Sequence, residues 1–245
     1  MELDVHPQLV APGEGEVLND AETRWTEILC DTDELVVSLF RRGAGVDGPE
    51  LHVHRTHADA FYVLEGALVV PLGPEAEPEQ VPAGSLALAP PLVAHAFRMD
   101  AGDVVLLNAH APGAGFAAYM RGDGVEFDQE PPPPGGGRPR SDAVLGRGTL
   151  VVDEAGLRVA RLADEPQLGV SVVTLAAGTE APPLGDGLTG LYVLVGAIAV
   201  AMPDEELVAG SGAWVTVRAG ARCTLSASGD GETQYVAFSV RAASR

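Results

Sequence analysis

Short apolar runs, separated by glycine, proline and polar residues, recur along the whole chain. Most of these runs are rich in valine, and they end at turn-forming residues. This pattern predicts β-strands, and no long helical period competes with it. We therefore expect an all-β barrel or sandwich. The runs lie at residues 35–40, 60–72, 85–90 and 103–111, and again at residues 149–153, 168–178, 190–202 and 212–220.

One polar stretch divides these runs into two groups. The segment PPPPGGGRPR at residues 131–140 combines stiff prolines with flexible glycines and offers no apolar side chain to a core. Such a composition is typical of a linker. We expect a linker over residues 129–142, an N-terminal domain over residues 1–128 and a C-terminal domain over residues 143–245.

The two groups of runs resemble each other. FYVLEGALVV at residues 61–70 aligns without a gap with LYVLVGAIAV at residues 191–200, and each is followed by a second strand led by Gly84 or Gly212. A tandem duplication explains this similarity. We therefore expect two barrels of related design.

Composition and charge narrow the classes of partner. The 245 residues carry a formal net charge of −20, which repels phosphates and anionic lipids, so we expect no nucleic acid and no membrane as a partner. All basic residues are arginines, which excludes lysine Schiff-base chemistry. The chain begins without an apolar targeting segment, and we expect a cytoplasmic protein. Cys30 and Cys223 are the only cysteines, so no disulfide framework is expected.

The candidate chemistry lies in the first half. The strand period of two places His52 and His54 on one face, where two neutral imidazoles can bind one cation at ~2.0–2.2 Å. Asp59 follows them at the start of the next run. His95 follows a second run that begins after Gly84.

The order of these residues strongly resembles the two motifs of the cupin superfamily. His52, His54, Asp59 and Gly66 match the first motif, while Gly84, Pro90 and His95 match the second. The resemblance implies two tandem cupin barrels of the double-stranded β-helix, or jelly-roll, type. It also implies that three histidines and one carboxylate hold a single divalent metal. We therefore expect metal ligands at His52, His54, Asp59 and His95.

Three positions depart from the family pattern. Asp59 replaces a glutamate, and its side chain is shorter by one C–C bond, about 1.5 Å. It is therefore either a direct ligand or an acceptor of a hydrogen bond from metal-bound water. Leu92 stands at a glycine position, and Met99 stands where an asparagine is sometimes found.

The second half has lost these ligands. Pro182, Leu184 and Thr189 stand opposite His52, His54 and Asp59, and Cys223 stands opposite His95. A lone thiol without histidine partners is better explained as a small buried hydrophobe. We expect metal only in the N-terminal barrel.

Other residues near the motifs have weaker signals. His57 is expected to be solvated on a loop, and His110 to be exposed at a strand end. Alternation from Asp59 and His95 places four apolar residues on the pocket wall, although ordinary barrel core is an equally good reading. These residues are Phe61, Val63, Phe97 and Met99.

Three imidazoles and at most one carboxylate leave coordination positions open on a six-coordinate ion. We expect an enzyme acting on a small molecule, first of all a dioxygenase similar to quercetin dioxygenase, with iron before Mn, Ni, Cu or Zn. Asp59 and Tyr62 are the candidate catalytic residues. A metal-dependent isomerase, lyase or cyclase and a non-catalytic ligand-binding protein remain alternatives. The sequence leaves a homodimer open.

Overall fold

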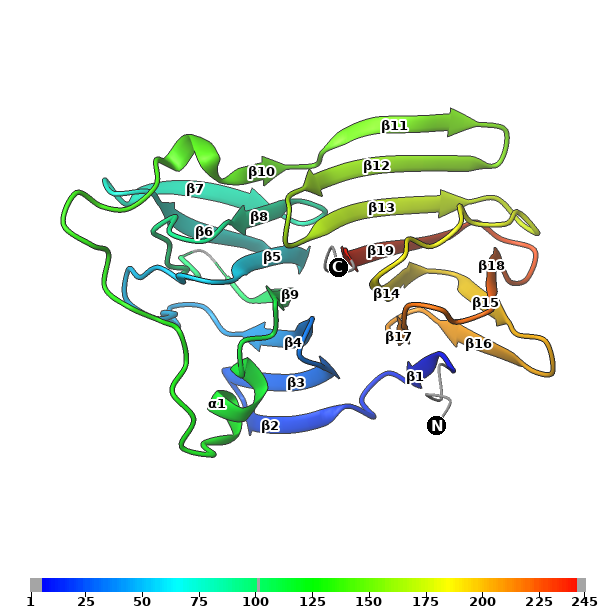
Figure 1. Ribbon diagram of the computed structural model, residues 1–245, viewed down its shortest axis with the longest axis horizontal. Coiled ribbons are helices and arrows are strands. Elements are labelled where there is room, and N and C mark those ends of the chain that lie inside the picture. The colour runs from blue at the N-terminus through cyan, green and yellow to red at the C-terminus, as the bar shows by residue number, and fades with distance from the viewer. Residues whose placement is uncertain (1–5, 101, 242–245) are drawn as a thin grey trace. The chain divides into compact units, whose positions relative to one another are not determined.

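The computed structural model describes residues 6–100 and 102–241, and Figure 1 shows that strands dominate them. The α-helix α1 (Phe116–Arg121) has six residues, and η1 (Arg140–Asp142) is a single 3₁₀ turn. The expectation of an all-β protein is therefore confirmed. No helix among the described residues is long and apolar enough to cross a membrane.

The chain divides into two compact units. The first unit spans Glu16–Arg147, and the second combines the described residues before Glu16 with those from Gly148 onward. The first unit contains a seven-stranded sheet in the order β10-β8-β5-β9-β4-β3-β2 and the antiparallel pair β6-β7. Its strands are β2 (Glu16–Ala21), β3 (Arg24–Asp31), β4 (Val36–Arg42), β5 (Ala58–Glu65), β6 (Ala67–Leu72), β7 (Glu77–Pro82), β8 (Leu86–Ala89), β9 (Val104–Ala111) and β10 (Val144–Gly146).

The second unit repeats this design. It has a seven-stranded sheet in the order β1-β17-β14-β19-β13-β12-β11 and a three-stranded sheet in the order β16-β15-β18. Its strands are β1 (Gln8–Val10), β11 (Thr149–Glu154), β12 (Leu157–Asp164), β13 (Gly169–Leu175), β14 (Leu188–Val195), β15 (Ala197–Ala201), β16 (Glu206–Gly210), β17 (Trp214–Val217), β18 (Thr224–Ala227) and β19 (Thr233–Val240).

The duplicated segments occupy equivalent places in the two units. β5 lies between β8 and β9, and β14 lies between β17 and β19. Both strands carry a bulge at the same aligned position, between Val63 and Glu65 in β5 and between Val193 and Val195 in β14. Gly66 and Gly196 follow the bulges with φ of 77° and 74°, a conformation that favours glycine.

Each large sheet is completed at one edge by a short strand that lies outside the residue range expected for that domain. β10 pairs with β8 at the edge of the first unit, and β1 pairs with β17 at the edge of the second. The expected linker also lies against the first unit, since Glu130 bridges Val53 and Arg138 bridges Val93. The two units therefore begin and end at other residues than the expected domains.

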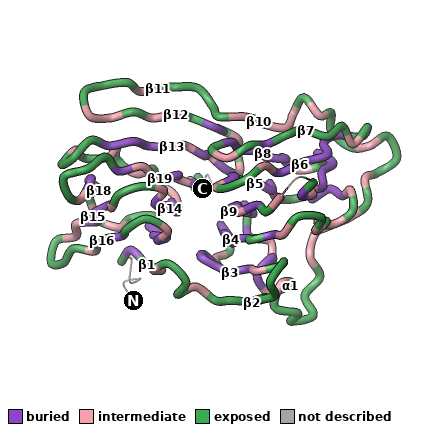
Figure 2. Tube along the Cα trace, turned by 180° about the vertical axis from the view of Figure 1, so that it is seen from behind, coloured by how far each residue is buried: buried purple, intermediate pink, exposed green. Residues whose placement is uncertain are grey.

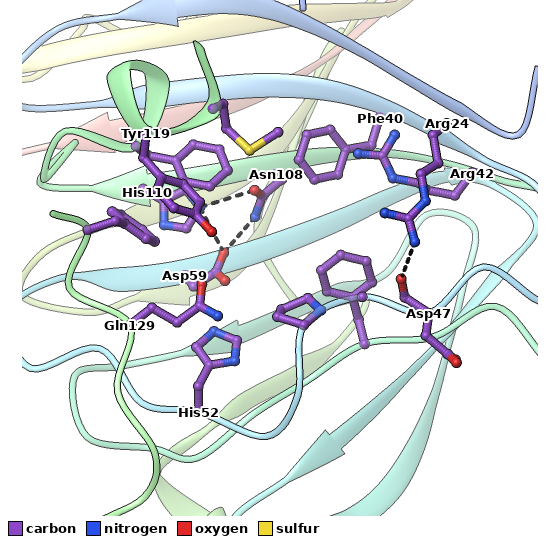
Figure 3. Close-up of a pocket in the computed structure, with 16 residues that line it drawn as sticks. Arg24, Phe40, Arg42, Asp47, His52, Asp59, Asn108, His110, Tyr119 and Gln129 are labelled. Atoms are coloured by element: carbon purple, nitrogen blue, oxygen red, sulfur yellow. Dashed lines mark hydrogen bonds and ion pairs between the residues drawn. The ribbon is translucent and has the colours of Figure 1, made fainter. Parts of the chain in front are cut away.

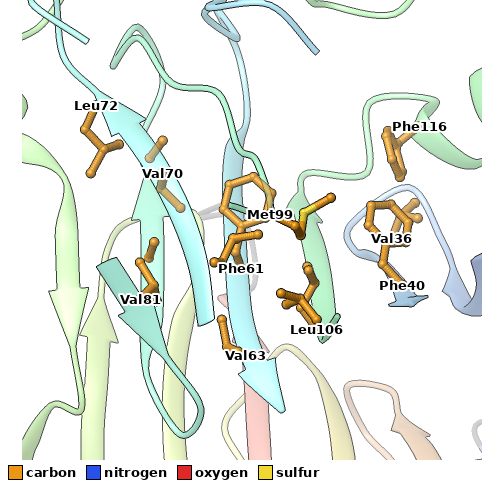
Figure 4. Packing of buried hydrophobic residues seen from close by; sticks show 14 of the residues in the cluster. Val36, Phe40, Phe61, Val63, Val70, Leu72, Val81, Met99, Leu106 and Phe116 are labelled. Atoms are coloured by element: carbon orange, nitrogen blue, oxygen red, sulfur yellow. The ribbon is translucent and has the colours of Figure 1, made fainter. Parts of the chain in front are cut away.

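The core of each unit lies between its two sheets. In the first unit, Phe61, Val63 and Leu106 from the large sheet pack with Val70 and Leu72 from the small one (Figure 4). Residues exposed to solvent are concentrated in outer strands such as β2 and β11, as Figure 2 shows. A separate cluster of the same kind fills the second unit.

Candidate metal centre

The structure brings the four expected metal ligands together. His52 and His95 belong to different motifs, yet their backbones pair directly through hydrogen bonds of 3.0 and 2.9 Å. Asp59 comes from β5 and His54 follows His52 on the same short segment. The four candidate ligand atoms lie within 4.8 Å of one another, and all four side chains are buried.

The backbone orients all three imidazole rings in the same way. Nδ1 of His52 donates to the carbonyl of Glu50 at 2.8 Å, and Nδ1 of His95 donates to that of Val93 at 2.9 Å. Nδ1 of His54 donates to the carbonyl of Asp128. A neutral ring with its proton on Nδ1 has a lone pair on Nε2. The three rings therefore carry Nε2 as the free donor for a metal.

The carboxylate of Asp59 faces two of these nitrogens. Its Oδ2 lies 3.2 Å from Nε2 of His95 and 3.6 Å from Nε2 of His54. In the neutral rings both nitrogens are acceptors, and so is the carboxylate oxygen. The lone pairs on these three atoms therefore repel one another. A divalent cation bound between the atoms would accept these lone pairs, so that coordination would replace the repulsion. The donor set therefore fits a metal.

Burial keeps the His52 ring neutral. Burial, reinforced by the charge of His95, lowers the pKa of His52 to about 3. Burial opposes ionisation of Asp59, whereas the hydrogen bond that the Asn108 amide donates to Oδ1 stabilises the ionised carboxylate. Neutral imidazole and ionised carboxylate are the states that bind metals.

A pocket of about 320 Å³ opens beside this group (Figure 3). His52, Asp59 and His110 lie on one side of the view, while Arg24, Arg42 and Phe40 lie on the other. Most of the remaining wall is apolar, and it comes from α1 and the loops. Its side chains include Phe97, Phe116, Tyr119, Met120 and Phe127.

The two arginines form the positive part of the pocket. Arg42 is buried, and it donates to the carbonyl of Trp25 at 2.6 Å and to Oγ1 of Thr26 at 2.9 Å. Arg24 donates to the backbone carbonyl of Asp47 at 3.2 Å. No ion pair among the described residues involves either arginine. Burial and the charge of Arg24 together lower the pKa of Arg42 to about 10, so an anion placed between them would be stabilised.

The expected pocket wall is only partly present. Phe97 lines the pocket, whereas Phe61, Val63 and Met99 are almost fully buried in the core of the first unit. They share the inner face of the unit with Asp59 and His95 but lie deeper, and the Phe61 ring packs on Phe97 at 5.3 Å. The alternation of side chains along a strand predicts the face of the sheet on which a residue lies, but it does not predict how deeply the side chain is buried.

Tyr62 does not reach the pocket. It follows Phe61 on β5 and so points to the face opposite Asp59. Its side chain is buried, and this burial raises its pKa. The expected catalytic role of Tyr62 therefore has no support in the geometry.

The expectations for His57 and His110 were wrong. Both side chains are buried, at 0% and 2% relative exposure. The register of β5 with β9 places His110 directly opposite Asp59, and His57 stacks on His54 at 4.0 Å. The same register brings Asn108 to the site. Strand alternation predicts that Asn108 and His110 lie on the same face of β9. Only the pairing of β9 with β5 shows that this face belongs to the site.

The backbone around Leu92 shows how the chain accommodates a leucine at a glycine position of the cupin motif. Its φ of 68° lies in the left-handed region, where the motif has glycine. Its backbone is held on both sides, because its N–H donates to the carbonyl of His54 at 2.7 Å and its carbonyl accepts from the N–H of Arg138 at 2.8 Å. The turn therefore keeps the glycine conformation with a leucine in it, at a cost of about 1–2 kcal/mol.

The second unit contains no comparable group. Within the described ranges, clusters of His, Cys, Asp and Glu close enough to share a metal occur only in the first unit. Cys223 is half-buried, and burial raises the pKa of its thiol, which disfavours the thiolate that would bind a metal.

Comparison with known proteins identifies the fold. No protein-family model and no curated protein matches the sequence. The structure is similar to that of a putative glyoxylate-induced protein from Pseudomonas aeruginosa, with a TM-score of 0.72 and 14% identity over 98% of this chain and 91% of that one. It is also similar to a mutant of Bacillus subtilis oxalate decarboxylase OxdC, with a TM-score of 0.69 and 14% identity over 97% and 78% of the two chains. The expected fold of two tandem cupin units is therefore confirmed.

Proposed function

We propose that the first unit is a metal-dependent enzyme that binds one divalent transition metal through His52, His54, His95 and Asp59. The observation that carries this proposal is the grouping of three imidazoles and the Asp59 carboxylate within 4.8 Å beside an open pocket, with Nε2 of His54 and of His95 facing the carboxylate. Bound there, a metal would supply a Lewis acid with coordination positions left open for a small molecule.

The pocket favours an anionic substrate with an apolar body. Arg24 and Arg42 provide the positive charges, and Arg42 has lost most of its contact with water. The aromatic side chains of Phe97, Phe116 and Phe127 provide an apolar wall. An enolate, phenolate or carboxylate of modest size fits both features.

Dioxygenase chemistry of the quercetin dioxygenase type is the first reaction that we propose. It requires an anionic oxygen of the substrate near the metal ligands and a base that accepts its proton. Asp59 suits the role of base, because its carboxylate lies at the pocket and the Asn108 amide fixes its orientation. Iron is the first metal for this chemistry.

A non-redox lyase or decarboxylase is the second candidate, and the same Asp59–Asn108 contact favours it. A buried, oriented carboxylate can move a proton in a reaction that needs no oxygen. Bacillus subtilis oxalate decarboxylase, whose fold is similar, has Mn(II) centres. Manganese is therefore the first metal for this second reaction.

Oxygen uptake separates the two reactions. We would load the metal-free chain with Fe(II) or Mn(II) and offer small aromatic enolates and carboxylates in an oxygen electrode. Oxygen consumption with product formation supports the dioxygenase, and turnover under nitrogen supports the lyase. Asp59→Asn should lower turnover by ~10²–10⁴ in either case. Failure of the wild-type chain to bind either metal would overturn the proposal.

A further inference from the structure

Unpartnered nitrogen atoms are concentrated next to the proposed metal centre. Among the described residues, six buried side-chain nitrogen and oxygen atoms lack a hydrogen-bond partner, and four of them are ring nitrogens of His54, His57 and His110. Each unpaired buried polar group costs about 1–3 kcal/mol. Such a concentration calls for a ligand.

The three rings are close together and shielded from solvent. Their candidate donor atoms lie within 4.8 Å of one another. Phe116 stacks on His110 with ring centroids 3.9 Å apart, and Phe127 packs against His57 at 5.1 Å. Aromatic rings therefore cover the cluster on two sides.

Hydrogen bonds determine which nitrogens are free. Nε2 of His110 donates to Oδ1 of Asn108 at 3.1 Å, which leaves Nδ1 with the lone pair. Nδ1 of His54 is bound to the carbonyl of Asp128, which leaves its Nε2. Neither nitrogen of His57 is hydrogen-bonded, and its Nδ1 lies 3.6 Å from a carboxylate oxygen of Asp128. His57 can therefore offer Nε2 while Asp128 supports its other nitrogen, a common arrangement in metal sites.

We infer that His54, His57 and His110 form a second metal position, which competes with the first for His54. Both positions need Nε2 of His54, and its single lone pair binds one ion at a time. The His57 ring must turn out of its stack on His54 to coordinate. The inference rests on the proposed function only through this shared ligand.

The donor sets predict different metal preferences. The second position offers three neutral imidazoles and no carboxylate ligand, which suits Zn(II), Cu(II) and Ni(II) better than Mn(II). The first position includes Asp59, whose anionic oxygen also suits Mn(II) and Fe(II). Zinc at the second position would take His54 from the first and so displace a manganese ion.

Paired variants of the full chain separate the two positions. His52→Ala/His95→Ala removes two ligands of the first position and leaves the second complete. His57→Ala/His110→Ala does the reverse, and His54→Ala damages both. The probes are Zn(II) and Mn(II) measured by titration calorimetry, and Co(II) measured by its visible absorption, which reports coordination number. Circular dichroism checks the fold of every variant.

We expect His52→Ala/His95→Ala to bind one Zn(II) but lose Mn(II). Adding His57→Ala to this variant should weaken Zn(II) binding by at least about 100-fold, because a direct ligand is lost. His57→Ala alone, which leaves the hydrogen bond between His110 and Asn108 in place, should keep its Mn(II) affinity within about threefold of the wild type.

Two outcomes would overturn the inference while leaving the proposed function intact. One is Zn(II) binding to His52→Ala/His95→Ala that is no tighter than binding to the same variant with His57→Ala added. The other is Co(II) absorption in the wild type that is unchanged by His57→Ala/His110→Ala under excess Co(II). If the wild-type chain did not bind Mn(II), that result would instead count against the first position and the proposed function.

Discussion

Asn108 donates a hydrogen bond of 2.6 Å from its side-chain amide to Oδ1 of Asp59, across the neighbouring strands β9 and β5. The other carboxylate oxygen, Oδ2, consequently faces His54 and His95. The carbonyl of the same amide accepts from His110, so the orientation of Asn108 is set from both ends. One asparagine thus holds Asp59 toward the first metal position and His110 toward the second.

This relationship predicts the effect of Asn108→Ala. Loss of the hydrogen bond frees the Asp59 carboxylate to rotate, and we expect Mn(II) affinity to fall about 10–100-fold, as for other partners of metal ligands. Gln234→Ala is a matched control, because Gln234 also donates an amide hydrogen bond, to Thr174 of the second unit. Titration calorimetry measures both variants. An unchanged affinity in Asn108→Ala would show that Asp59 needs no orientation.

A second prediction concerns metal stoichiometry. We expect one Mn(II) per chain, because the positions that align with His52, His54 and Asp59 in the second unit are Pro182, Leu184 and Thr189. His95→Ala should remove most Mn(II) binding, since it takes one of three imidazoles. Elemental analysis after purification without added metal tests both statements. Two Mn(II) ions per chain would contradict the assignment.

The grouping of the four candidate ligands was predictable from the sequence, whereas most of the pocket was not. His52 and His54 follow the strand period, and the duplicated segments identified both units. The place of His110 depends instead on the register of β9 with β5, which no local pattern contains. Arg42 was hidden for the same reason, because its partners Trp25 and Thr26 belong to the adjacent strand.

The contrast between Phe61 and Phe97 gives a third prediction. Phe61 is 1% exposed in the core, so Phe61→Ala should lower the free energy of unfolding by about 3–5 kcal/mol. Phe97 is only half-buried and lines the pocket, so Phe97→Ala should cost less stability and change ligand binding instead. Urea unfolding compares the two variants. A smaller loss for Phe61→Ala than for Phe97→Ala would place Phe61 on the pocket wall after all.

The arginine pair predicts how the pocket selects its ligand. Arg24→Met removes a charge that lines the pocket while keeping an aliphatic side chain, and anionic ligands should bind about 10-fold more weakly or worse. Arg41→Met removes the same charge from an exposed side chain that lies over Trp25, outside the pocket lining. It should leave binding unchanged. Equal losses in both variants would show a general effect of net charge, which added salt would also suppress.

The buried histidines predict an acid-sensitive metal-free protein. Burial lowers the pKa of His52 and His110 to about 3 and that of His57 to about 4, all below the ordinary value of 6.5. The unfolded chain therefore binds more protons than the folded chain below pH 6.5. Stability should be complete above pH 6.5 and should fall as the pH drops toward 4, by up to about 1.4 kcal/mol per pH unit for each histidine.

His57→Gln tests this dependence, because it removes one titrating ring from the cluster. We expect the slope of unfolding free energy against pH, measured with urea between pH 7 and pH 5, to become shallower by as much as one histidine contributes. Val63→Ala is the control, since a cavity in the core lowers stability equally at every pH and leaves the slope unchanged. A His57→Gln slope equal to that of the wild type would mean that His57 binds protons equally in the folded and unfolded chains, so that folding does not lower its pKa.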